Sequence, residues 1–398
     1  MPRVATFTVD FLGCKVSHAD AQEIRERLAV EGHSEVREEA DVAVISTCCV
    51  TQEAVHKSRK AARRAARSAG RVYVTGCAAN LRDAFTGLPD NVVVVALPSE
   101  RTAGFVAGDV GAIACVHTGA SLDRVRAFVK IQDGCSFACA FCVVPIVRGA
   151  SRSRPAERVL AEVWRRVAEG HREVVLTGIN LGCYRDRGAG YTLARLVRQV
   201  GATPGLARLR LSSVEVNHVS DELLAAMRET ATVSPHLHVP LQSGDDGVLR
   251  AMGRRYTAQS YLRRLRRAEG FNLTTDVIVG FPGEDEQAFR RTLATVAEAG
   301  ITKVHVFPYS PRPGTRTDQQ NPVSADVKRE RSARLRALSG EACLEAWQRK
   351  VGQEDVVLVD RPGRGFGDDY FPWLVQAPVG ELVPVRGRAV TPEGILAA

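Results

Sequence analysis

The stretch Gly134–Cys142 reads GCSFACAFC and places three cysteines at C-x3-C-x2-C spacing. It follows an apolar run, Ala127–Gln132, that predicts a β-strand. Three thiolates on one short loop can hold an iron–sulfur cluster and leave one position open for an outside ligand. A zinc site would need a fourth protein ligand, and no His or Cys lies close behind Cys142. The stretch therefore predicts a reactive metal centre at the end of a strand.

The run before this loop is the first of six apolar runs that alternate with helical patterns. The other five are Glu173–Gly178, Leu206–Ser213, His236–Gly244, Thr274–Glu284 and Lys303–Ser310. Six β/α units predict a partial (β/α)6 barrel, whose reactive groups sit at the carboxyl ends of the strands. Four of these ends are polar or rich in glycine and indicate a ligand-binding rim: Thr177-Gly178, Ser212 to Glu215, Gln242 to Gly244 and Gly280 to Glu284.

A second set of cysteines precedes the barrel. The runs Val4–Val9, Asp41–Ser46 and Arg71–Thr75 alternate with helical patterns, which predicts a doubly wound parallel sheet. Cys14, Cys48 and Cys77 each follow the end of a different run, and the carboxyl ends of parallel strands face one crevice. We therefore expect the three cysteines to meet in space. The alternative is that they are three small buried hydrophobic residues.

Length and composition set the frame for these motifs. The chain has 398 residues, 45% hydrophobic and 25% charged, as in globular proteins with a sizeable core. No apolar run reaches the roughly 20 residues that cross a bilayer, and the N-terminus lacks a signal peptide's apolar core, so we expect a cytoplasmic protein without membrane partners. Ten cysteines in a reducing compartment favour metal ligands or catalysts over disulfides. The net charge of +9 favours polyanionic partners.

The last part of the chain has a different pattern, in which helical periodicity fades after Gly340. Short β-like runs are expected at Val356–Val359, Trp373–Val375, Leu382–Val385 and Arg388–Val390, and Arg361–Asp369 is expected to be a flexible loop. The α/β chain therefore divides into three expected domains. They are residues 1–118 with the parallel sheet, 119–345 with the partial barrel, and 346–398 with a small β module.

In their order along the chain, these motifs resemble those of the radical S-adenosylmethionine (SAM) enzymes, and most closely their methylthiotransferase branch. The resemblance rests on GCSFACAFCVVPIVRG (134–149), EVVLTGINLGCY (173–184), HLHVPLQSGDDGVLRAMGRRYT (236–257), DVIVGFPGEDE (276–286), FPYSPRPGT (307–315) and the N-terminal LGCK, STC and TGC. It covers nearly all of residues 4–340. The segment from Val351 onward resembles a shortened TRAM domain, a small RNA-binding β-barrel.

The resemblance implies two [4Fe–4S] clusters and a role for each cysteine set. Cys135, Cys139 and Cys142 would hold the cluster whose open iron chelates SAM and whose reduction yields a 5′-deoxyadenosyl radical. Phe141 is similar to the family's aromatic residue that contacts the adenine. The other expected SAM contacts come from the barrel rim: Thr177, Gly178, Ser212, Glu215, Gln242 and Gly280. Cys14, Cys48 and Cys77 would hold a second cluster that supplies or carries sulfur, and a second SAM would donate the methyl group.

The resemblance also favours one substrate among three. LGCKVSHAD (12–20) and TCCVTQEAVHKSRK (47–60) are similar to the enzymes that act on C2 of N6-threonylcarbamoyladenosine, beside the tRNA anticodon. The alternatives within the branch are isopentenyl-adenosine in tRNA and an aspartate of a ribosomal protein. Ser17 and Ser46 stand where this family has asparagine. From other classes, the alternatives are a non-catalytic iron–sulfur protein that binds RNA and a plain zinc-binding β/α protein.

Several further features complete the expectations. Lys57–Arg71 is strongly basic at helical spacing, which suits either a solvated face or contact with phosphates. A second basic cluster has the same two interpretations: Arg263, Arg264, Arg266 and Arg267. Cys49, beside the family ligand position Cys48, is not expected to be a ligand, and Cys115, Cys183 and Cys343 are expected to be structural. The expected partners are tRNA, SAM and a low-potential electron donor, and the chain is expected to be a monomer.

Overall fold

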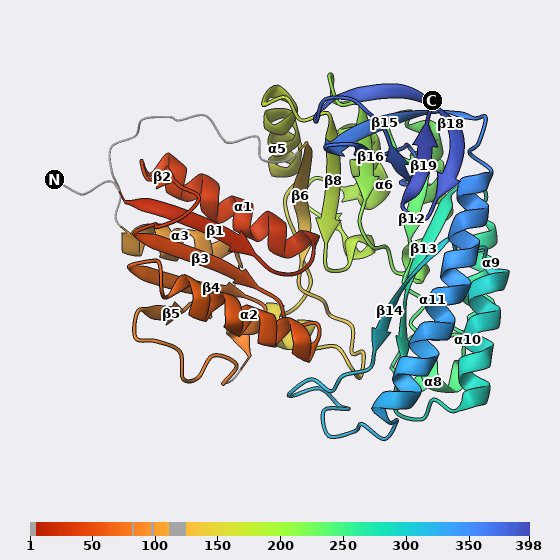
Figure 1. Cartoon of the computed structure of the whole chain (residues 1–398), viewed down its shortest axis with the longest axis horizontal. Helices are drawn as coiled ribbons and strands as arrows, with labels where there is room; N and C mark the ends of the chain where they lie inside the picture. The colour runs from red at the N-terminus through yellow and green to blue at the C-terminus, as the bar shows by residue number, and fades with distance from the viewer. Residues whose placement is uncertain (1–4, 82, 97–98, 111–124) are drawn as a thin grey trace. The chain divides into compact units, whose positions relative to one another are not determined.

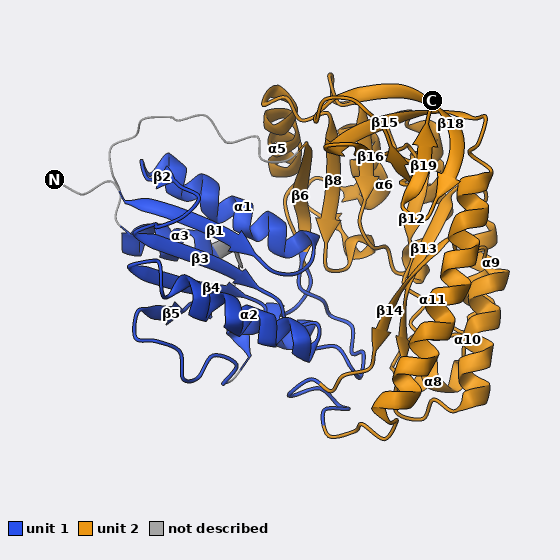
Figure 2. Cartoon of the chain, viewed as in Figure 1, with its two compact units in different colours: residues 1–122, 133–151, 312–318 blue, residues 123–132, 152–311, 319–398 orange. Residues whose placement is uncertain are grey.

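The computed structural model describes residues 5–81, 83–96, 99–110 and 125–398. The chain divides into two compact units, coloured separately in Figure 2. Unit 1 comprises residues 1–122, 133–151 and 312–318, and unit 2 comprises residues 123–132, 152–311 and 319–398. The cysteine loop 134–142 thus belongs to the same compact unit as the N-terminal sheet. The expected boundary at 118/119 and Cys115 lie outside the described residues, and the three-domain division stays a prediction.

Unit 1 is built on a parallel sheet of five strands in the order β2-β1-β3-β4-β5 (Figure 1). The strands are β1 (Thr6–Phe11), β2 (Ser34–Glu35), β3 (Val42–Thr47), β4 (Arg71–Gly76) and β5 (Val92–Val94). The helices are α1 (Lys15–Val30), α2 (Gln52–Ala65), α3 (Ser99–Val110), α4 (Val144–Arg148) and the 3-10 turn η1 (Ala78–Asn80). This is the strand order of flavodoxin-like folds. The sequence predicted the three central strands and missed the short β2 and β5.

The side chains of β3 show that the sheet is covered on both faces. Successive residues of a strand point to opposite faces. Val42 and Val44 pack with residues of α1 and α3 in one apolar cluster, whereas Ala43 and Ile45 pack with Ala62 of α2 in another. The doubly wound arrangement is therefore confirmed. A strand buried on both faces reads as a continuous apolar run, which is why VAVIS was visible in the sequence.

Unit 2 contains the partial barrel, and its six strands follow chain order. They are β6 (Arg126–Asp133), β8 (Glu173–Gly178), β11 (Arg208–Leu211), β12 (His236–His238), β13 (Asn272–Val279) and β14 (Lys303–Pro308). The first three pair in parallel, as do the last three, and the parallel bridges Leu209–Val233 and Ser213–His238 connect the two sheets. The sheet thus curves in two linked parts, and the predicted (β/α)6 partial barrel is confirmed.

Helices and short strands surround these six strands. The helices are α5 (Ala156–Ala168), α6 (Leu193–Gly201), α7 (Asp221–Glu229), α8 (Asp246–Ala251), α9 (Ala258–Arg266), α10 (Glu286–Glu298) and α11 (Ala325–Gln348), with the 3-10 turns η2 (Leu181–Cys183) and η3 (Val216–His218). The short strands are β7 (Arg152–Ser153) beside β6, and the β9 (Arg185–Asp186) and β10 (Tyr191–Thr192) pair. Within the described residues, no helix is both long and apolar enough to span a bilayer.

The C-terminal segment forms a closed five-stranded barrel in the order β15-β16-β17-β19-β18. Its strands are β15 (Glu354–Arg361), β16 (Arg364–Phe366), β17 (Pro372–Leu374), β18 (Leu382–Thr391) and β19 (Gly394–Ala397). The expected β module is confirmed, but two details were wrong. The expected loop 361–369 contains β16, paired on both sides. The two expected runs within 382–390 are the single strand β18, whose register shifts between Gly387 and Ala389.

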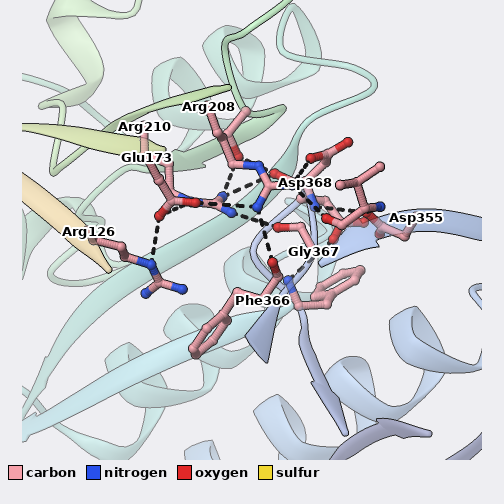
Figure 3. Close-up of polar contacts among 12 residues, drawn as sticks. Arg126, Glu173, Arg208, Arg210, Asp355, Phe366, Gly367 and Asp368 are labelled. Carbon is pink, nitrogen blue, oxygen red and sulfur yellow. Dashed lines mark hydrogen bonds and ion pairs between the residues drawn. The ribbon is translucent and has the colours of Figure 1, made fainter. Parts of the chain in front are cut away.

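A buried arginine cluster explains why the expected loop is ordered (Figure 3). Glu173, at the amino end of β8, is fully buried and forms ion pairs with Arg126 at 2.7 Å, Arg210 at 3.0 Å and Arg208 at 3.3 Å. Burial would raise the pKa of Glu173, but the three guanidinium groups hold it below its usual value. The charged groups compensate one another inside the protein.

Two of these arginines also bind the loop that follows β16. Arg208 donates to the Phe366 carbonyl at 3.1 Å and contacts the Asp368 carboxylate. Arg210 donates to the Gly367 carbonyl at 2.6 Å. The small barrel is thereby anchored at the amino ends of the partial-barrel strands, opposite the ends that carry the predicted rim. Loop carbonyls that would otherwise face water have buried cationic partners here, and a sequence pattern does not reveal such partners.

Candidate metal centres

The sheet of unit 1 brings the first cysteine set together at one edge. Phe11 of β1 is paired with Ser46 of β3, and Thr47 of β3 with Gly76 of β4, so the three strands end side by side. Cys14, Cys48 and Cys77 follow within three residues of those ends. The pKa of Cys48 is raised to about 11, mainly by burial and also by the nearby Cys14 and Cys77 thiols. The three sulfurs therefore lie close enough to influence one another.

A tight turn allows this approach between the first two cysteines. Gly13 has a φ of +133°, and a Cβ added to it would lie 2.8 Å from Cβ of Cys48. The Ser17 hydroxyl lies 3.8 Å from Sγ of Cys14, and Ser46 donates a hydrogen bond to the Ser17 carbonyl at 3.3 Å. The two positions where this chain departs from the family's asparagines thus contact each other beside the cysteines.

Cys77 has two neighbours that change its chemistry. A hydrogen bond with Cys49 and the positive charge of Arg148 lower the pKa of Cys77, although burial opposes this change. The same hydrogen bond to Cys77 raises the pKa of Cys49, and burial adds to that effect. Within this hydrogen-bonded pair, Cys77 is therefore the more acidic thiol. This difference agrees with Cys77, rather than Cys49, as a metal ligand, because the thiolate is the form that binds metals.

The second cysteine set lies on a loop held by backbone contacts. Cys135 N–H donates to the Gly149 carbonyl at 3.0 Å, and Phe137 N–H donates to Sγ of Cys135 at 3.4 Å. Gly134 has a φ of +66°, and a Cβ there would lie 2.2 Å from the Ala150 carbonyl oxygen. The chain can follow this path only with glycine. All three thiols are partly exposed, so they can reach an outside ligand.

A second segment of unit 1 supports the same loop. Arg316 donates to the Ala138 carbonyl at 2.7 Å, and the Thr317 hydroxyl donates to the Ala140 carbonyl at 3.1 Å. These two carbonyls lie between the cysteines of the loop. Residues 312–318 are therefore part of the structure that shapes the cysteine loop, although they are far from it in sequence.

The donor chemistry at both sites suits iron–sulfur clusters. Each set consists of thiols alone, and a cluster binds each thiolate through a different iron. In the described part of the chain, no group of three or more His, Cys, Asp or Glu side chains surrounds a position for one metal ion. One predicted ligand set lies at a single edge of the sheet and consists of Cys14, Cys48 and Cys77. The other set lies on one loop that Arg316 and Thr317 contact, and it consists of Cys135, Cys139 and Cys142.

Unit 2 carries the predicted SAM contacts at the carboxyl ends of its strands. Thr177 and Ser212, at the ends of β8 and β11, are buried, and within the described residues their hydroxyl oxygens have no hydrogen-bond partner. A buried hydroxyl without a partner is costly in free energy unless a ligand satisfies it. Gly178 allows close packing, because a Cβ there would lie 3.1 Å from the Gln132 side chain. These three residues fit a polar ligand at this edge.

The other predicted contacts are engaged within the protein. Glu215 forms an ion pair with Arg254 at 3.3 Å and accepts the backbone N–H of Asn217 at 2.9 Å. Gln242 has a φ of +67° and belongs to an isolated bridge with Val277 on β13. A Cβ on Gly280 would lie 2.5 Å from the Lys328 side chain. Phe141 is partly buried on the cysteine loop. Their contact with SAM stays a prediction.

Sequence reasoning missed several residues at these sites. Arg148 and Asp20 lie beside Cys77, and Asn180 is buried at the rim with its side-chain oxygen unpartnered within the described residues. The sequence offered one signal for both Arg148 and Asn180, namely their positions in the motifs. Arg148 lies near the end of the motif that contains the three cysteines, and Asn180 lies two residues after Gly178. Of the cysteines expected to be structural, Cys183 lies 3.4 Å from Nε2 of His218 and Cys343 is buried.

Comparison with known proteins identifies the family to which this chain belongs. Residues 129–296 match the radical SAM superfamily, and residues 6–95 match the uncharacterised protein family UPF0004. The threonylcarbamoyladenosine tRNA methylthiotransferase MtaB of Chlamydia pneumoniae is 33% identical over 413 residues, which cover 98% of this chain and 97% of that protein. The chain belongs to the radical SAM methylthiotransferase family. The family's cofactors are accordingly SAM and [4Fe–4S] clusters.

The chain is also similar to a second tRNA-modifying enzyme in sequence and to a solved structure in fold. The tRNA-2-methylthio-N(6)-dimethylallyladenosine synthase of Paracoccus denitrificans is 35% identical over 438 residues, covering 100% of this chain and 98% of that protein. The solved structure of TsrM, a radical S-adenosylmethionine methyltransferase from Kitasatospora setae with cobalamin and a [4Fe–4S] cluster bound, has a TM-score of 0.59 at 13% identity. It covers 90% of this chain and 80% of that chain, and this likeness concerns the fold.

Proposed function

We propose that this methylthiotransferase acts on tRNA and places a methylthio group on C2 of N6-threonylcarbamoyladenosine at the position 3′ of the anticodon. The observation that carries the proposal is the convergence of Cys14, Cys48 and Cys77 at one sheet edge, in a chain that also has the Cys135–Cys142 loop. The motif LGCKVSHAD and the MtaB relative support threonylcarbamoyladenosine as the substrate.

Each cysteine set would hold one [4Fe–4S] cluster. Cys135, Cys139 and Cys142 supply three thiolates, which leaves one iron open to the amino and carboxylate groups of SAM. When bound and reduced, this cluster allows SAM to yield a 5′-deoxyadenosyl radical, which can remove hydrogen from an unactivated aromatic C–H. Cys14, Cys48 and Cys77 would hold the auxiliary cluster at which sulfur is supplied or carried. A second SAM would provide the methyl group.

Buried polar residues at the rim of unit 2 would orient SAM. The hydroxyls of Thr177 and Ser212 and the side-chain oxygen of Asn180 are available for hydrogen bonds to a polar ligand, since no described residue satisfies them. Phe141 would contact the adenine ring.

Nucleoside mass spectrometry of tRNA from a deletion strain tests the proposal. The 2-methylthio derivative of threonylcarbamoyladenosine should disappear and return on complementation with the wild-type gene. Complementation with Cys142→Ala should not restore it. An unchanged peak in the deletion strain would refute the proposed substrate.

Isopentenyladenosine in tRNA is the second candidate, and the full-length similarity to the Paracoccus synthase favours it. The same spectra distinguish the two, because each methylthio nucleoside has its own mass. Loss of only the isopentenyl product would transfer the assignment to that substrate.

The remaining parts of the proposal concern the protein's surroundings. Cleavage of SAM requires a low-potential electron donor, and a tRNA substrate implies a cytoplasmic enzyme. We propose that it acts as a monomer, which light scattering of the cluster-loaded protein can test against a dimer.

A further inference from the structure

Helix α2 carries an unusual concentration of positive charge next to the auxiliary cysteines. It begins at Gln52, four residues after Cys48, and its side chains include five Lys or Arg and one Glu. Thr51 caps its first turn by accepting the N–H of Ala54 at 3.1 Å. The basic run seen in the sequence is thus a regular helix whose first turn adjoins the predicted cluster ligands.

The two faces of α2 differ sharply in chemistry. Ala62 is fully buried against the sheet, in a cluster with Val55, Ala65 and residues of β3 and β4. The opposite face exposes the cations Lys57, Lys60, Arg63 and Arg64, and the exposed Arg67 follows two residues after the helix ends. The small apolar side chains hold the helix on the sheet, and the long basic ones are free to meet an outside partner.

Most of this charge is not neutralised by the protein itself. Lys57 pairs with Glu53 at 3.5 Å, and Arg59 donates to the Thr86 carbonyl at 3.0 Å. Within the described residues, Lys60, Arg63, Arg64 and Arg67 take part in no ion pair. By contrast, two exposed arginines of α10 and α11 have acidic partners, since Arg290 pairs with Glu286 and Arg329 pairs with Asp326.

The basic face borders a groove that leads toward the cysteines. The groove has a volume of about 510 Å³ and is lined along α2 by its basic residues, with Leu12 from the end of β1. Leu12 precedes Cys14 by two residues, in the turn that brings Cys14 to Cys48. A chain lying along this groove would therefore pass beside the auxiliary cysteines.

We propose that the α2 groove binds RNA phosphates and guides the tRNA toward the auxiliary cysteines. The inference rests on the proposed function, because it takes tRNA as the partner. A row of unpaired cations, repeated every three or four residues, matches the repeating charge of a nucleic-acid backbone. Phosphate contacts position a substrate without reading its sequence, as suits an enzyme whose specificity lies in one modified base.

The triple variant K60Q/R63Q/R67Q tests this groove. Glutamine keeps helix propensity and removes three charges. The matched control is R290Q/R329Q/R336Q, which removes three exposed arginines from α10 and α11. Affinity for an anticodon stem-loop RNA and for full tRNA is measured at several salt concentrations with the cluster-loaded protein. The groove variant should bind at least tenfold more weakly, and its salt slope should fall by roughly two to three.

The outcomes separate this inference from the proposed function. The control variant and a charge-preserving K60R/R63K/R67K variant should bind like wild type. Equal losses of affinity in the groove variant and in the R290Q/R329Q/R336Q control, or an unchanged salt slope, would overturn the proposed RNA-binding role of the groove. If wild type binds no tRNA but an acidic protein binds α2, both the proposed substrate and the RNA role of the groove are wrong.

Arg148 carries a second, independent inference. This buried residue ends α4, and its guanidinium contacts three segments of unit 1. Nε donates to Sγ of Cys77 at 2.9 Å, Nη2 donates to Asp20 at 2.8 Å, and Nη1 donates to Asp133 at 3.1 Å. Asp133 is the last residue before the cysteine loop, so Arg148 connects the auxiliary sulfur to the root of the other cysteine set.

We infer that Arg148 is a positioning residue that tunes the auxiliary cluster through Cys77. This inference also rests on the proposed cluster. Hydrogen bonds to a ligand sulfur and a nearby positive charge stabilise the reduced, more negative cluster and so raise its reduction potential. Asp20 and Asp133 hold the guanidinium so that its Nε faces the sulfur.

The potential is measured by electron paramagnetic resonance in a C135A/C139A/C142A background, so that only the auxiliary cluster contributes. Arg148→Gln should lower the reduction potential of the auxiliary cluster, so that a smaller fraction of clusters is reduced at a fixed solution potential. Arg148→Lys should lower the reduction potential less, because it keeps the positive charge. An unchanged potential at full iron content would overturn the inference. Equal loss of iron in both variants would also overturn it, since it would indicate a purely structural role.

Discussion

Cys135, Cys139 and Cys142 lie on one loop within residues 135–142, whereas Cys14, Cys48 and Cys77 come from three turns spread over residues 14–77. The loop is shaped by its own backbone and by Arg316 and Thr317. The other set depends on the register of three parallel strands and on the turn at Gly13. A local motif can be recognised from spacing, but a distributed one exists only once the sheet has formed.

The two sets also differ in exposure and charge. The three loop cysteines are all partly exposed, whereas in the other set Cys48 and Cys77 are buried and Cys14 is exposed. Cys77 also has a cationic neighbour in Arg148. We expect the loop set to take the exchangeable co-substrate and the other set to hold the sulfur. The following predictions test this division of labour, beginning with the largest effect.

Removing one whole cysteine set should abolish one activity and spare the other cluster. C135A/C139A/C142A should lose all 5′-deoxyadenosine formation with SAM and dithionite, because no open iron remains. C14A/C48A/C77A should still cleave SAM but form no methylthio product. Each variant should retain about four of roughly eight irons. If either triple variant lost both clusters while remaining folded, the two sites would not be independent.

Gly134→Ala should disrupt the loop site strongly. The left-handed backbone costs about 1–3 kcal/mol for a non-glycine residue, and the added Cβ would clash with the Ala150 carbonyl. Gly87→Ala is the matched control, since Gly87 also has positive φ but has open space around its Cβ position. Iron analysis should show loss of most loop-bound iron in Gly134→Ala alone. Equal iron content in the two variants would mean that the close approach is unimportant.

Cys48 and Cys49 should differ although they are adjacent. Cys48→Ala should lose the auxiliary cluster, because Cys48 packs against the turn that carries Cys14. Cys49→Ala should keep it, because Cys49 is the less acidic thiol of its hydrogen-bonded pair with Cys77. Acid-labile sulfide and iron in the C135A/C139A/C142A background provide the measurement. The reverse pattern would make Cys49 the ligand.

Glu173→Gln should leave both cysteine sites intact and reduce stability. It removes the carboxylate charge that three buried arginines share, and breaking such a buried ion pair costs about 3–5 kcal/mol. Thermal unfolding at neutral pH should show the lower stability of the variant, and its iron content should equal that of wild type. The pKa of Glu173 is lowered in the folded state. The ionised Glu173 carboxylate therefore contributes to folding stability above the ordinary glutamate pKa, and this contribution is lost as the pH falls through the folded-state pKa. The difference from wild type should therefore shrink in acid.

The sequence by itself determined the parts that depend on local pattern. Continuous apolar runs such as Val42–Thr47 predicted central strands, because residues buried on both faces must all be apolar. The C-x3-C-x2-C spacing indicated a shared centre, and the strand-end positions of Cys14, Cys48 and Cys77 indicated where the sheet would bring them. These inferences needed only periodicity and the rule that parallel strands end at one edge.

Tertiary structure alone decided which polar groups face one another. Arg148 beside Cys77, the ordering of 361–369 by Arg208 and Arg210, and the short edge strands β2 and β5 all depend on partners distant in sequence. A hydrogen bond or buried ion pair acts over a few ångströms and leaves no periodic trace in the chain, whereas burial of a strand or helix face repeats along it. That difference in range is why the elements were predictable and their contacts were not.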